Sequence, residues 1–369
     1  MNELVAKAFD IACNDLKSCY LEHGIVGGLT RLKDYHARNS FFASFGSIAL
    51  EDFDIVKKNI CFFLSLQRND GMIPVMVSKK LKPFYSFWFF NEPVDHNALL
   101  VIAFSDIAAK ANDSLFIEKN FDGIFLAVKF LEKKEKMGLI EEGLGGNWAH
   151  SVLKNGFVLY TNCCYFKALK GFSTVCRLTG REALAEKYSE KAVAVKEKIN
   201  KMFWAGTYYA DWIDFKRHEN FSSDGNVLSI LWGIADDEQS KMIENNIRQY
   251  RLNTVPLKTC HPLYPFWRIM WFLLPLQAYH YHNGSSWTWL GALNVLALKR
   301  LGWNQEARDE IRAIARTITE NGTVIDVLDN GKPFSSLLLK SEIHFSWGAG
   351  LFVKAVKELY KEKTMVDDD

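Results

Sequence analysis

The stretch Tyr281-His282-Asn283-Gly284-Ser285-Ser286-Trp287-Thr288-Trp289 gathers aromatic rings, an imidazole, an amide and hydroxyls around one glycine. It leads directly into an apolar pattern with helical spacing over residues 290–301. A turn that opens a helix leaves backbone N–H groups and polar side chains at the helix end. One interpretation is a sugar site on the rim of a helical barrel. The other is a capped helix, with Asn283 or Ser285 as the N-cap and both tryptophans in the core.

The composition indicates a large globular chain without a nucleic-acid partner. The chain has 369 residues, of which 49% are hydrophobic. This length exceeds the usual limit of about 250–300 residues for one core, but it suits one large repetitive domain. The charges are interleaved and sum to +2, whereas a nucleic-acid-binding protein would show a basic stripe. The aromatic content of 14% is high, and aromatic rings stack on the C–H faces of sugars.

The cysteines and the apolar runs predict a soluble cytoplasmic protein. The seven cysteines form an odd set without a zinc-like C-x-x-C pair, which favours free thiols in a reducing compartment. The first 21 residues contain scattered acidic residues, unlike a signal peptide. No uninterrupted apolar run reaches the roughly 18 residues that a membrane span needs. We therefore expect no membrane partner.

Helical periodicity dominates the chain, and long connections alternate with short ones. The predicted helices cover residues 4–21, 41–50, 53–66, 95–111, 115–136, 162–178, 181–203, 225–234, 236–250, 290–301, 304–320 and 345–361. Residues 72–94 read as irregular, and residues 204–224 as short strands or loop. Asp113 is expected to cap a helix and Gly180 to end one. Short connections make antiparallel neighbours, so this alternation predicts paired helices with their long loops on one rim.

The predicted fold class is all-α, an (α/α)6 toroid that forms a single domain over residues 1–369, with residues 362–369 as a frayed tail. A tetratricopeptide-like solenoid is the rival architecture. It would require self-similarity at a period of about 34 residues, which the sequence lacks.

Each long loop brings polar and aromatic residues to the start of the second helix of a pair. Each of these residues also has a plain structural explanation. Asp95 and Asp224 could be N-caps, Glu342 a solvated surface acid and Trp148 a core residue. Their shared position at the start of these helices favours a sugar site on the common rim.

Three segments carry a resemblance to a known group. They are Trp267-Arg268, Tyr281-His282-Asn283-Gly284-Ser285-Ser286-Trp287 and Ser346-Trp347-Gly348-Ala349-Gly350-Leu351. They resemble the neutral/alkaline invertases, the glucosidase part of glycogen-debranching enzymes and the mannosylglycerate-hydrolase-like domains, which are inverting (α/α)6-barrel glycoside hydrolases. The resemblance runs from about residue 35 to residue 351. It implies an inverting glycoside hydrolase that acts on a small α-linked saccharide or glycoside, α-glucosidase-like or mannosylglycerate-hydrolase-like.

The resemblance also assigns roles, and this chain departs from the pattern at three of them. The Arg-Asp pair that grips the sugar corresponds to Arg38 and Asn39. The general acid, an Asp in the group, corresponds to His150, and the general base, a Glu, corresponds to Asp326. Inverting hydrolysis uses two carboxyl groups about 6.5–9.5 Å apart, although a histidine can also donate a proton.

Other carboxylates could serve as the acid or the base in place of His150 and Asp326. Glu342 is the alternative base, and Asp95, Glu141 and Glu142 are further candidates, Asp95 and Glu141 as the acid. The predicted sugar-binding residues are Tyr35, Arg38, Asn39, Trp148, Asp224, Asn226, Tyr281, His282, Asn283, Trp287 and Trp347. No cofactor is implied, and no metal, because the histidines lie in separate loops without ligand spacing. The expected partner is a small carbohydrate.

Two alternatives remain open beside the hydrolase. The first is a catalytically inactive barrel that binds a carbohydrate, which the departures at Asn39, His150 and Asp326 favour. The second is a structural scaffold whose partner surface is the aromatic patch at residues 84–90, although that patch is better explained as a lid over the cleft. An enzyme predicts two carboxylates across a cleft, a binder an aromatic pocket with one, and a scaffold no closed pocket.

Overall fold

The computed structural model describes residues 1–86, 92–254 and 256–361. In these ranges the chain is built mainly from α-helices, and every predicted helix is present. They are α1 (Glu3–Ser18), α2 (Ala37–Ala49), α3 (Phe53–Ser65), α4 (Asp95–Ala108), α5 (Ser114–Lys133), α6 (Leu159–Leu178), α7 (Glu182–Phe203), α8 (Ser223–Trp232), α9 (Asp237–Gln249), α10 (Thr288–Arg300), α11 (Asn304–Asn321) and α12 (Ser346–Leu359).

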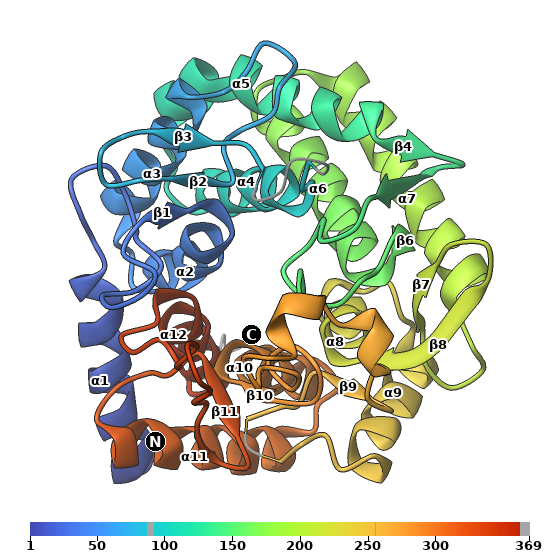
Figure 1. Cartoon of the computed structure of the whole chain (residues 1–369). Helices are drawn as coiled ribbons and strands as arrows, with labels where there is room; N and C mark the ends of the chain where they lie inside the picture. The colour runs from blue at the N-terminus through green and yellow to red at the C-terminus, as the bar shows by residue number, and fades with distance from the viewer. Residues whose placement is uncertain (87–91, 255, 362–369) are drawn as a thin grey trace, which may run out of the picture.

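The helices form two concentric rings (Figure 1). The inner ring consists of α2, α4, α6, α8, α10 and α12, each of which packs against the next, and α12 packs against α2 to close it. The odd-numbered helices surround this ring (Figure 1). The prediction of an (α/α)6 toroid is confirmed.

The hydrophobic pattern explains which helices lie inside. The inner helix α4 buries 13 of its 14 residues, and its sequence is apolar on all sides. The outer helix α9 buries only five of 13 residues, on one face. A helix that is apolar all round must be surrounded by protein, whereas an amphipathic helix covers a core with one stripe.

Glycine closes the inner ring. A Cβ on Gly46 of α2 would lie 2.3 Å from the carbonyl oxygen of Gly350 in α12. A Cβ on Gly350 would lie 2.5 Å from the carbonyl oxygen of Ala43. Any side chain at either position would push the two helices apart, so the contact between the first and last inner helices requires these residues.

Short antiparallel strands lie at the N-terminal ends of the inner helices. They form three sheets, ordered β1-β2-β3, β4-β5-β6-β7-β8-β9 and β10-β11-β12. The strands are β1 (Tyr35–His36), β2 (Met76–Val77), β3 (Pro83–Phe84), β4 (Glu135–Lys136), β5 (Leu139–Glu142), β6 (Gly156–Val158), β7 (Ala210–Ile213), β8 (Arg217–Ser222), β9 (Cys260–His261), β10 (Ser286–Trp287), β11 (Val327–Asp329) and β12 (Lys332–Pro333). Strands β1, β6, β8 and β10 lead directly into α2, α6, α8 and α10, which fixes where these helices begin.

Several local predictions have clear outcomes. Asp113 caps α5 by accepting from the backbone N–H of Phe116, and Gly180 adopts a φ of 67° just after α6, as predicted. The short strands expected within residues 204–224 are present as β7 and β8. The irregular assignment of residues 72–94 is wrong in part, because β2 and β3 lie there.

The N-cap interpretations are wrong. The residue that precedes α10 is Trp287, so neither Asn283 nor Ser285 caps that helix. Asp95 and Asp224 lie inside the first turns of α4 and α8 rather than at the caps. Their carboxylates bind side chains from other loops instead, as described below.

Some predictions fall on residues that the structure does not describe. Residues 87–91, which include most of the aromatic patch at 84–90, lie outside the described residues, and so does the tail at 362–369. Within the described ranges, none of the helices combines the length and the apolar character that crossing a membrane demands.

Candidate active site

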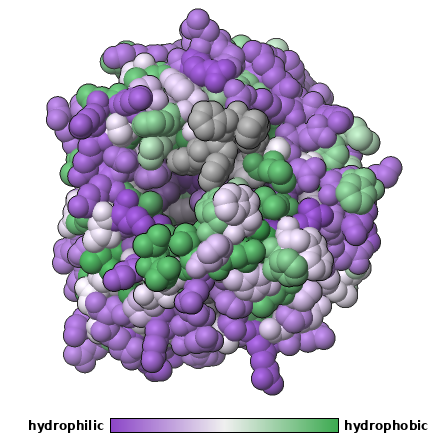
Figure 2. Space-filling view, viewed as in Figure 1, coloured by the Kyte–Doolittle hydropathy of each residue, from purple (hydrophilic) through white to green (hydrophobic). Residues whose placement is uncertain are grey.

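A cavity of about 440 Å³ lies where the N-terminal ends of the inner helices converge. Figure 2 shows a hollow on this face of the molecule, with apolar side chains beside it. The lining residues come from loops far apart in the sequence: Arg31, Leu32, His36, Arg38, Asn39, Trp148, His150, Ser151, Met270, Phe272, Leu273, Tyr281, His282, Trp287, Asp326, Leu339, Phe345 and Trp347. The scaffold hypothesis predicted no such cavity, so the structure argues against it.

Nine of the residues predicted from sequence line this cavity. They are Arg38, Asn39, Trp148, His150, Tyr281, His282, Trp287, Asp326 and Trp347. The remaining predicted residues Tyr35, Asp95, Asp224, Asn226, Asn283 and Glu342 do not line it. The shared position of these loops at the starts of the inner helices therefore brings most of the predicted set together.

Indole and imidazole rings form one wall. The Trp148 ring meets the rings of His282, Trp287 and Trp289 edge-on, with centroids 5.1, 5.3 and 4.8 Å away. The His282 ring stacks on Trp287 at 5.1 Å, and its Nδ1 lies 2.7 Å from Ser151 Oγ. Edge-to-face packing of this kind fixes ring orientations. The wall is therefore a preformed apolar surface with polar edges.

Asp224 orients the central tryptophan of this wall. Its carboxylate accepts from the indole Nε1 of Trp148 and from the hydroxyl of Ser222. It also accepts from the backbone N–H of Gly225 at 2.6 Å. Asp224 thus holds Trp148 against the cavity without lining the cavity itself.

Asp95 performs the same task for Arg38. Its two carboxylate oxygens accept from Arg38 Nε at 2.6 Å and from Arg38 Nη2 at 2.7 Å, and its side chain is fully buried. This bidentate pair orients the guanidinium in the cavity wall. Because both oxygens face Arg38, the position of Asp95 does not support its candidacy as the general acid.

Asn226 and Asn283 bind the backbone of neighbouring loops. The amide of Asn283 accepts from the N–H of Tyr264 at 2.7 Å and donates to its carbonyl at 3.0 Å. Asn226 makes the same pair of bonds to the backbone of Tyr209. Tyr35 is also turned away from the cavity, and its ring packs edge-on against Phe62. These residues shape loops around the site.

Glu342 is a buried anchor and not a solvated surface acid. One of its oxygens accepts from the backbone N–H and the hydroxyl of Thr30, both at 2.7 Å. The other accepts from the N–H groups of Arg31 at 2.6 Å and Leu32 at 3.0 Å. The side chain is fully buried and does not line the cavity. Its geometry does not support its candidacy as the base.

Asp326 is the only carboxylate in the cavity lining among the residues that the structure describes. Its Oδ2 accepts from Arg31 Nη2 at 2.9 Å, and its Oδ1 accepts from the backbone N–H groups of Val327 and Glu342 at 2.7 and 2.8 Å. The same Arg31 nitrogen donates to the Tyr281 hydroxyl at 3.1 Å. Burial raises the pKa of Asp326 to about 7, and the nearby Arg31 charge opposes that rise.

The loop at residues 281–287 is joined to the segment that follows Asp326 by a short sheet. Strand β10 pairs with β11, which sets Trp287 opposite Val327, and the N–H of Thr288 donates to the carbonyl of Asp326 at 3.1 Å. The pairing explains how the aromatic wall and the carboxylate come to lie in one cavity although they are some forty residues apart in sequence.

The histidines of the cavity are neutral at pH 7. Burial lowers the pKa of His36 and of His150 to about 4, and the Arg38 charge lowers both further. Burial also lowers the pKa of His282 well below its ordinary value, with a further contribution from His150. His150 Nδ1 lies 3.0 Å from the carbonyl oxygen of Trp148.

Solved structures share this architecture at low identity. A rhamnosidase from Klebsiella oxytoca with rhamnose bound is 15% identical, with a TM-score of 0.73, over 95% of this chain and 63% of that chain. A GH63 mannosylglycerate hydrolase from Thermus thermophilus in complex with glucose is 12% identical, with a TM-score of 0.72, over 94% and 99%. A bacterial glucoamylase complexed with acarbose is 13% identical, with a TM-score of 0.70, over 97% and 55%. The chain thus spans less than two thirds of the rhamnosidase and of the glucoamylase.

No curated protein sequence matches the chain significantly. The family model of the mannosylglycerate hydrolase MGH1-like glycoside hydrolase domain matches residues 132–348, more than half of the chain. The chain belongs to this glycoside hydrolase family. The group to which the sequence was compared is thereby confirmed.

The other carboxylates considered as catalytic groups lie outside the cavity. Glu142 is buried, accepts from Asn147 Nδ2 at 2.5 Å and from the hydroxyl of Thr161, and burial raises its pKa to about 8. Glu141 pairs with Lys136 on the surface, 3.0 Å away. Neither reaches the cavity lining.

Several residues of the cavity lining were not predicted from sequence, among them Arg31, His36, Ser151, Met270 and Phe272. Arg31 lies in the connection between the helices predicted at residues 4–21 and 41–50, and its partner Asp326 is 295 residues away in sequence. His36 lies between the predicted residues Tyr35 and Arg38, and Ser151 directly follows His150, so both lie within or beside predicted clusters. Met270 and Phe272 lie in a mixed segment without a periodic signal.

Proposed function

We propose that the chain hydrolyses a small α-linked glycoside with inversion in the central cavity, with Asp326 as the general base. The observation that carries the proposal is the position of Asp326, the one carboxylate of the described cavity lining, fixed by Arg31 and two backbone N–H groups. An inverting base must hold a water molecule and accept its proton. Among the described residues only Arg31 donates a hydrogen bond to Asp326 Oδ2, which leaves acceptor capacity for that water.

The rest of the cavity supports recognition of one sugar ring. Trp148, Trp287 and Trp347 offer apolar surface, while Arg38 and Asn39 offer polar groups. The indole Nε1 of Trp347 is buried without a partner in the described part of the chain. Ligand sites commonly combine apolar walls with a few such polar groups. A cavity of about 440 Å³ is of the size that a small glycoside needs.

The leaving group is the point at which this site departs from two-carboxylate hydrolysis. The histidine at the acid position, His150, is neutral because burial lowers its pKa to about 4, and a neutral imidazole is a weak proton donor. The C1–O bond of the glycoside would therefore break with the electron pair left on an oxygen that receives little proton assistance. The attacking water bonds to C1 and loses its proton to Asp326. Such a reaction requires a leaving group of low basicity.

The rim of the cavity fits an aromatic leaving group. Phe266, Trp267 and Trp271 are exposed, Trp271 with 79% of its surface accessible. Their segment continues into the cavity wall at Met270 and Phe272. Aromatic rings pair with a gain of about 0.5–1.5 kcal/mol beyond the area they bury. We therefore propose a phenolic glycoside as the substrate class.

The test compares three kinds of substrate that share a sugar: a disaccharide, a nitrophenyl glycoside and a glycosyl fluoride. We expect hydrolysis of the fluoride and the nitrophenyl glycoside, slow or no hydrolysis of the disaccharide, and inversion at C1 by NMR. Asp326→Asn should reduce the rate at least a hundredfold. Asp329→Asn should not, because Asp329 is an exposed carboxylate in β11, the strand that follows Asp326. Fast release from the disaccharide would show that an effective proton donor exists. Hydrolysis that survives Asp326→Asn would refute Asp326 as the base.

A second candidate is a sugar-binding barrel without catalysis. The observation that favours it is the single carboxylate of the described lining, with His150 where the family places an acid. This candidate predicts saturable binding of a monosaccharide by calorimetry and no release from the glycosyl fluoride. Because the fluoride needs no proton donor, its hydrolysis would exclude the binding-only function.

A further inference from the structure

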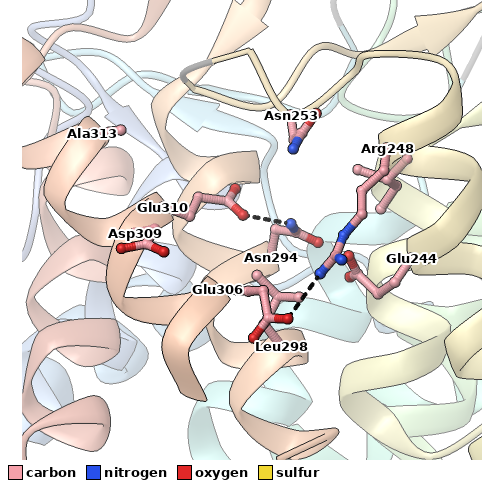
Figure 3. Close-up of a pocket in the computed structure, with 10 residues that line it drawn as sticks. Glu244, Arg248, Asn253, Asn294, Leu298, Glu306, Asp309, Glu310 and Ala313 are labelled. Carbon is pink, nitrogen blue, oxygen red and sulfur yellow. Dashed lines mark hydrogen bonds and ion pairs between the residues drawn. The ribbon is translucent and has the colours of Figure 1, made fainter. Parts of the chain in front are cut away.

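A second cavity, of about 420 Å³, lies in the outer wall between α9, α10 and α11, and none of its residues lines the central cavity. Figure 3 shows side chains from all three helices that turn toward one another in it. Glu244 and Arg248 come from α9, Asn294 from α10, and Glu306 and Glu310 from α11. The outer helices form its sides and the inner helix α10 forms its floor.

The charges in this cavity do not balance. Among the described residues four carboxylates line it, those of Glu244, Glu306, Asp309 and Glu310, against one lining cation, Arg248. Asp309 also pairs with Arg312, which lies outside the lining, at 3.1 Å. Arg248 Nη2 lies 3.5 Å from Glu306 Oε1 near the mouth. The Arg248 guanidinium also lies over the Trp303 ring, 4.6 Å from its centroid. Glu244 and Glu310, deeper in, have no ion pair among the described residues.

The floor of the cavity presents buried oxygens without hydrogen-bond partners. In the described part of the chain these are Glu244 Oε1, Glu310 Oε1 and Asn294 Oδ1. Glu244 and Asn294 are each 1% exposed. Asn294 Nδ2 donates to the other oxygen of Glu310, Oε2, at 2.7 Å. A buried acceptor without a donor destabilises a fold, so three of them together point to a ligand that brings donors.

The protonation of the two acids agrees with a missing cation. Burial raises the pKa of Glu310 to about 8. Burial also raises the pKa of Glu244, to which the Glu310 charge adds, while Arg248 opposes the shift. A bound cation would restore both carboxylates to their charged forms and would release protons as it bound.

The lining restricts the chemistry of that cation. Within the described ranges no three His, Cys, Asp or Glu side chains are close enough to hold a metal ion, which argues for a larger cation. A quaternary ammonium group would need an aromatic cage, and no aromatic residue lines the cavity. A guanidinium fits two oxygens in one plane, whereas these three acceptors come from three helices. An ammonium group carries three N–H donors in a pyramid, one for each acceptor.

We propose that this cavity binds a primary alkylammonium group, with aliphatic diamines as the ligand class. One ammonium would donate to Glu244, Glu310 and Asn294 on the floor. The carboxylates of Glu306 and Asp309 near the mouth would hold the second. The site is independent of the function proposed for the central cavity, and its ligand would join α9 to α11.

Titration calorimetry with 1,4-diaminobutane tests the proposal on the whole chain. We expect one saturable site, and release of protons when the titration is repeated in buffers of different ionisation enthalpy. Glu244→Gln keeps the shape but removes the charge and should weaken binding at least tenfold. Glu310→Gln should also weaken binding at least tenfold. Because Glu310 is partly exposed, this variant provides the test if Glu244→Gln does not fold. Glu320→Gln changes an exposed carboxylate of α11 outside the cavity and should leave the Kd unchanged.

The bis(trimethylammonium) analogue of 1,4-diaminobutane separates hydrogen bonding from bulk charge. It carries the same two charges without N–H donors, so it should bind at least tenfold more weakly than the diamine. Equal binding of the two cations would overturn the proposal, and so would a Kd that neither glutamine variant changes. Absence of any saturable binding of the diamine would overturn it as well.

Discussion

Replacing Glu342 with glutamine separates the anchor role that the structure indicates for this residue from the role of catalytic base that the sequence left open. In the structure its carboxylate binds the backbone of residues 30–32, which carries Arg31 to Asp326. If Glu342 is an anchor, Glu342→Gln should destabilise the fold and impair the site only through Arg31. If Glu342 is the catalytic base, the variant should keep its stability and lose hydrolysis.

The magnitude follows from the hydrogen bonds. The four donors to Glu342 are three backbone N–H groups and the Thr30 hydroxyl. The hydroxyl can reverse and accept from the new NH2 group, but at least one N–H is then stranded, at a cost of about 1–3 kcal/mol. The remaining bonds change from charged to neutral acceptors and weaken by up to about 1 kcal/mol each. We expect a total loss of about 3 kcal/mol in the free energy of unfolding.

The assay is urea unfolding followed by circular dichroism and tryptophan fluorescence, together with glycosyl fluoride hydrolysis. Asp329→Asn provides the control, because Asp329 is an exposed carboxylate near the cavity. Loss of less than about 1 kcal/mol, combined with complete loss of hydrolysis, would refute the anchor role. Addition of free carboxylate, such as formate, would then be expected to rescue a missing base but not a missing anchor.

Three further predictions concern neighbouring groups. Because burial raises the pKa of Asp326 to about 7 and a base must be ionised, kcat/KM should rise as pH increases through about 7; a fall over that range would make Asp326 a proton donor. Asp211→Asn removes the ion pair of the buried Lys154 ammonium, which lies 2.7 Å from the Asp211 carboxylate. The free energy of unfolding, measured with urea, should therefore fall by about 3–5 kcal/mol. An unchanged unfolding midpoint would contradict this expectation. Trp148→Phe removes the donor to Asp224 and should weaken monosaccharide binding measured by calorimetry; an unchanged Kd would show that the indole does not orient the wall.

The ring architecture could be predicted because long connections alternate with short ones along the chain, which implies paired helices with their long loops on one rim. Which helix of a pair lies inside follows from burial, as the buried inner helix α4 and the amphipathic outer helix α9 illustrate. The strands could not be predicted in most loops. Strands such as β1, β2 and β10 are two residues long, which is too short for alternation of apolar and polar residues to appear.

The site was predictable in its location but not in its pairings. The position of Asp95, Asp224 and Glu342 at the starts of inner helices follows from the loop pattern. Their roles do not, because Asp95 binds Arg38 from 57 residues away and Glu342 binds Arg31 from 311 residues away. An aspartate at a helix start resembles an N-cap in sequence, and only the closed ring brings in the guanidinium or indole that competes with the helix for its carboxylate.

The contacts of Glu342 also explain how a single carboxylate can stay charged enough to serve as a base in this cavity. Burial alone would protonate Asp326, and the Arg31 guanidinium at 2.9 Å opposes this shift. Arg31 can lie there only because Glu342 holds the backbone of residues 30–32, and the backbone N–H of Glu342 itself donates to Asp326. One residue thus binds both the base and the loop that supplies its counter-charge. Burial has the largest effect on the pKa of Asp326 and raises it, and the Glu342 charge adds to the rise, whereas Arg31 and the backbone N–H of Glu342 lower it. A variant that moves Arg31 away from Asp326 but keeps Glu342 should therefore shift the pH profile upward before it abolishes hydrolysis.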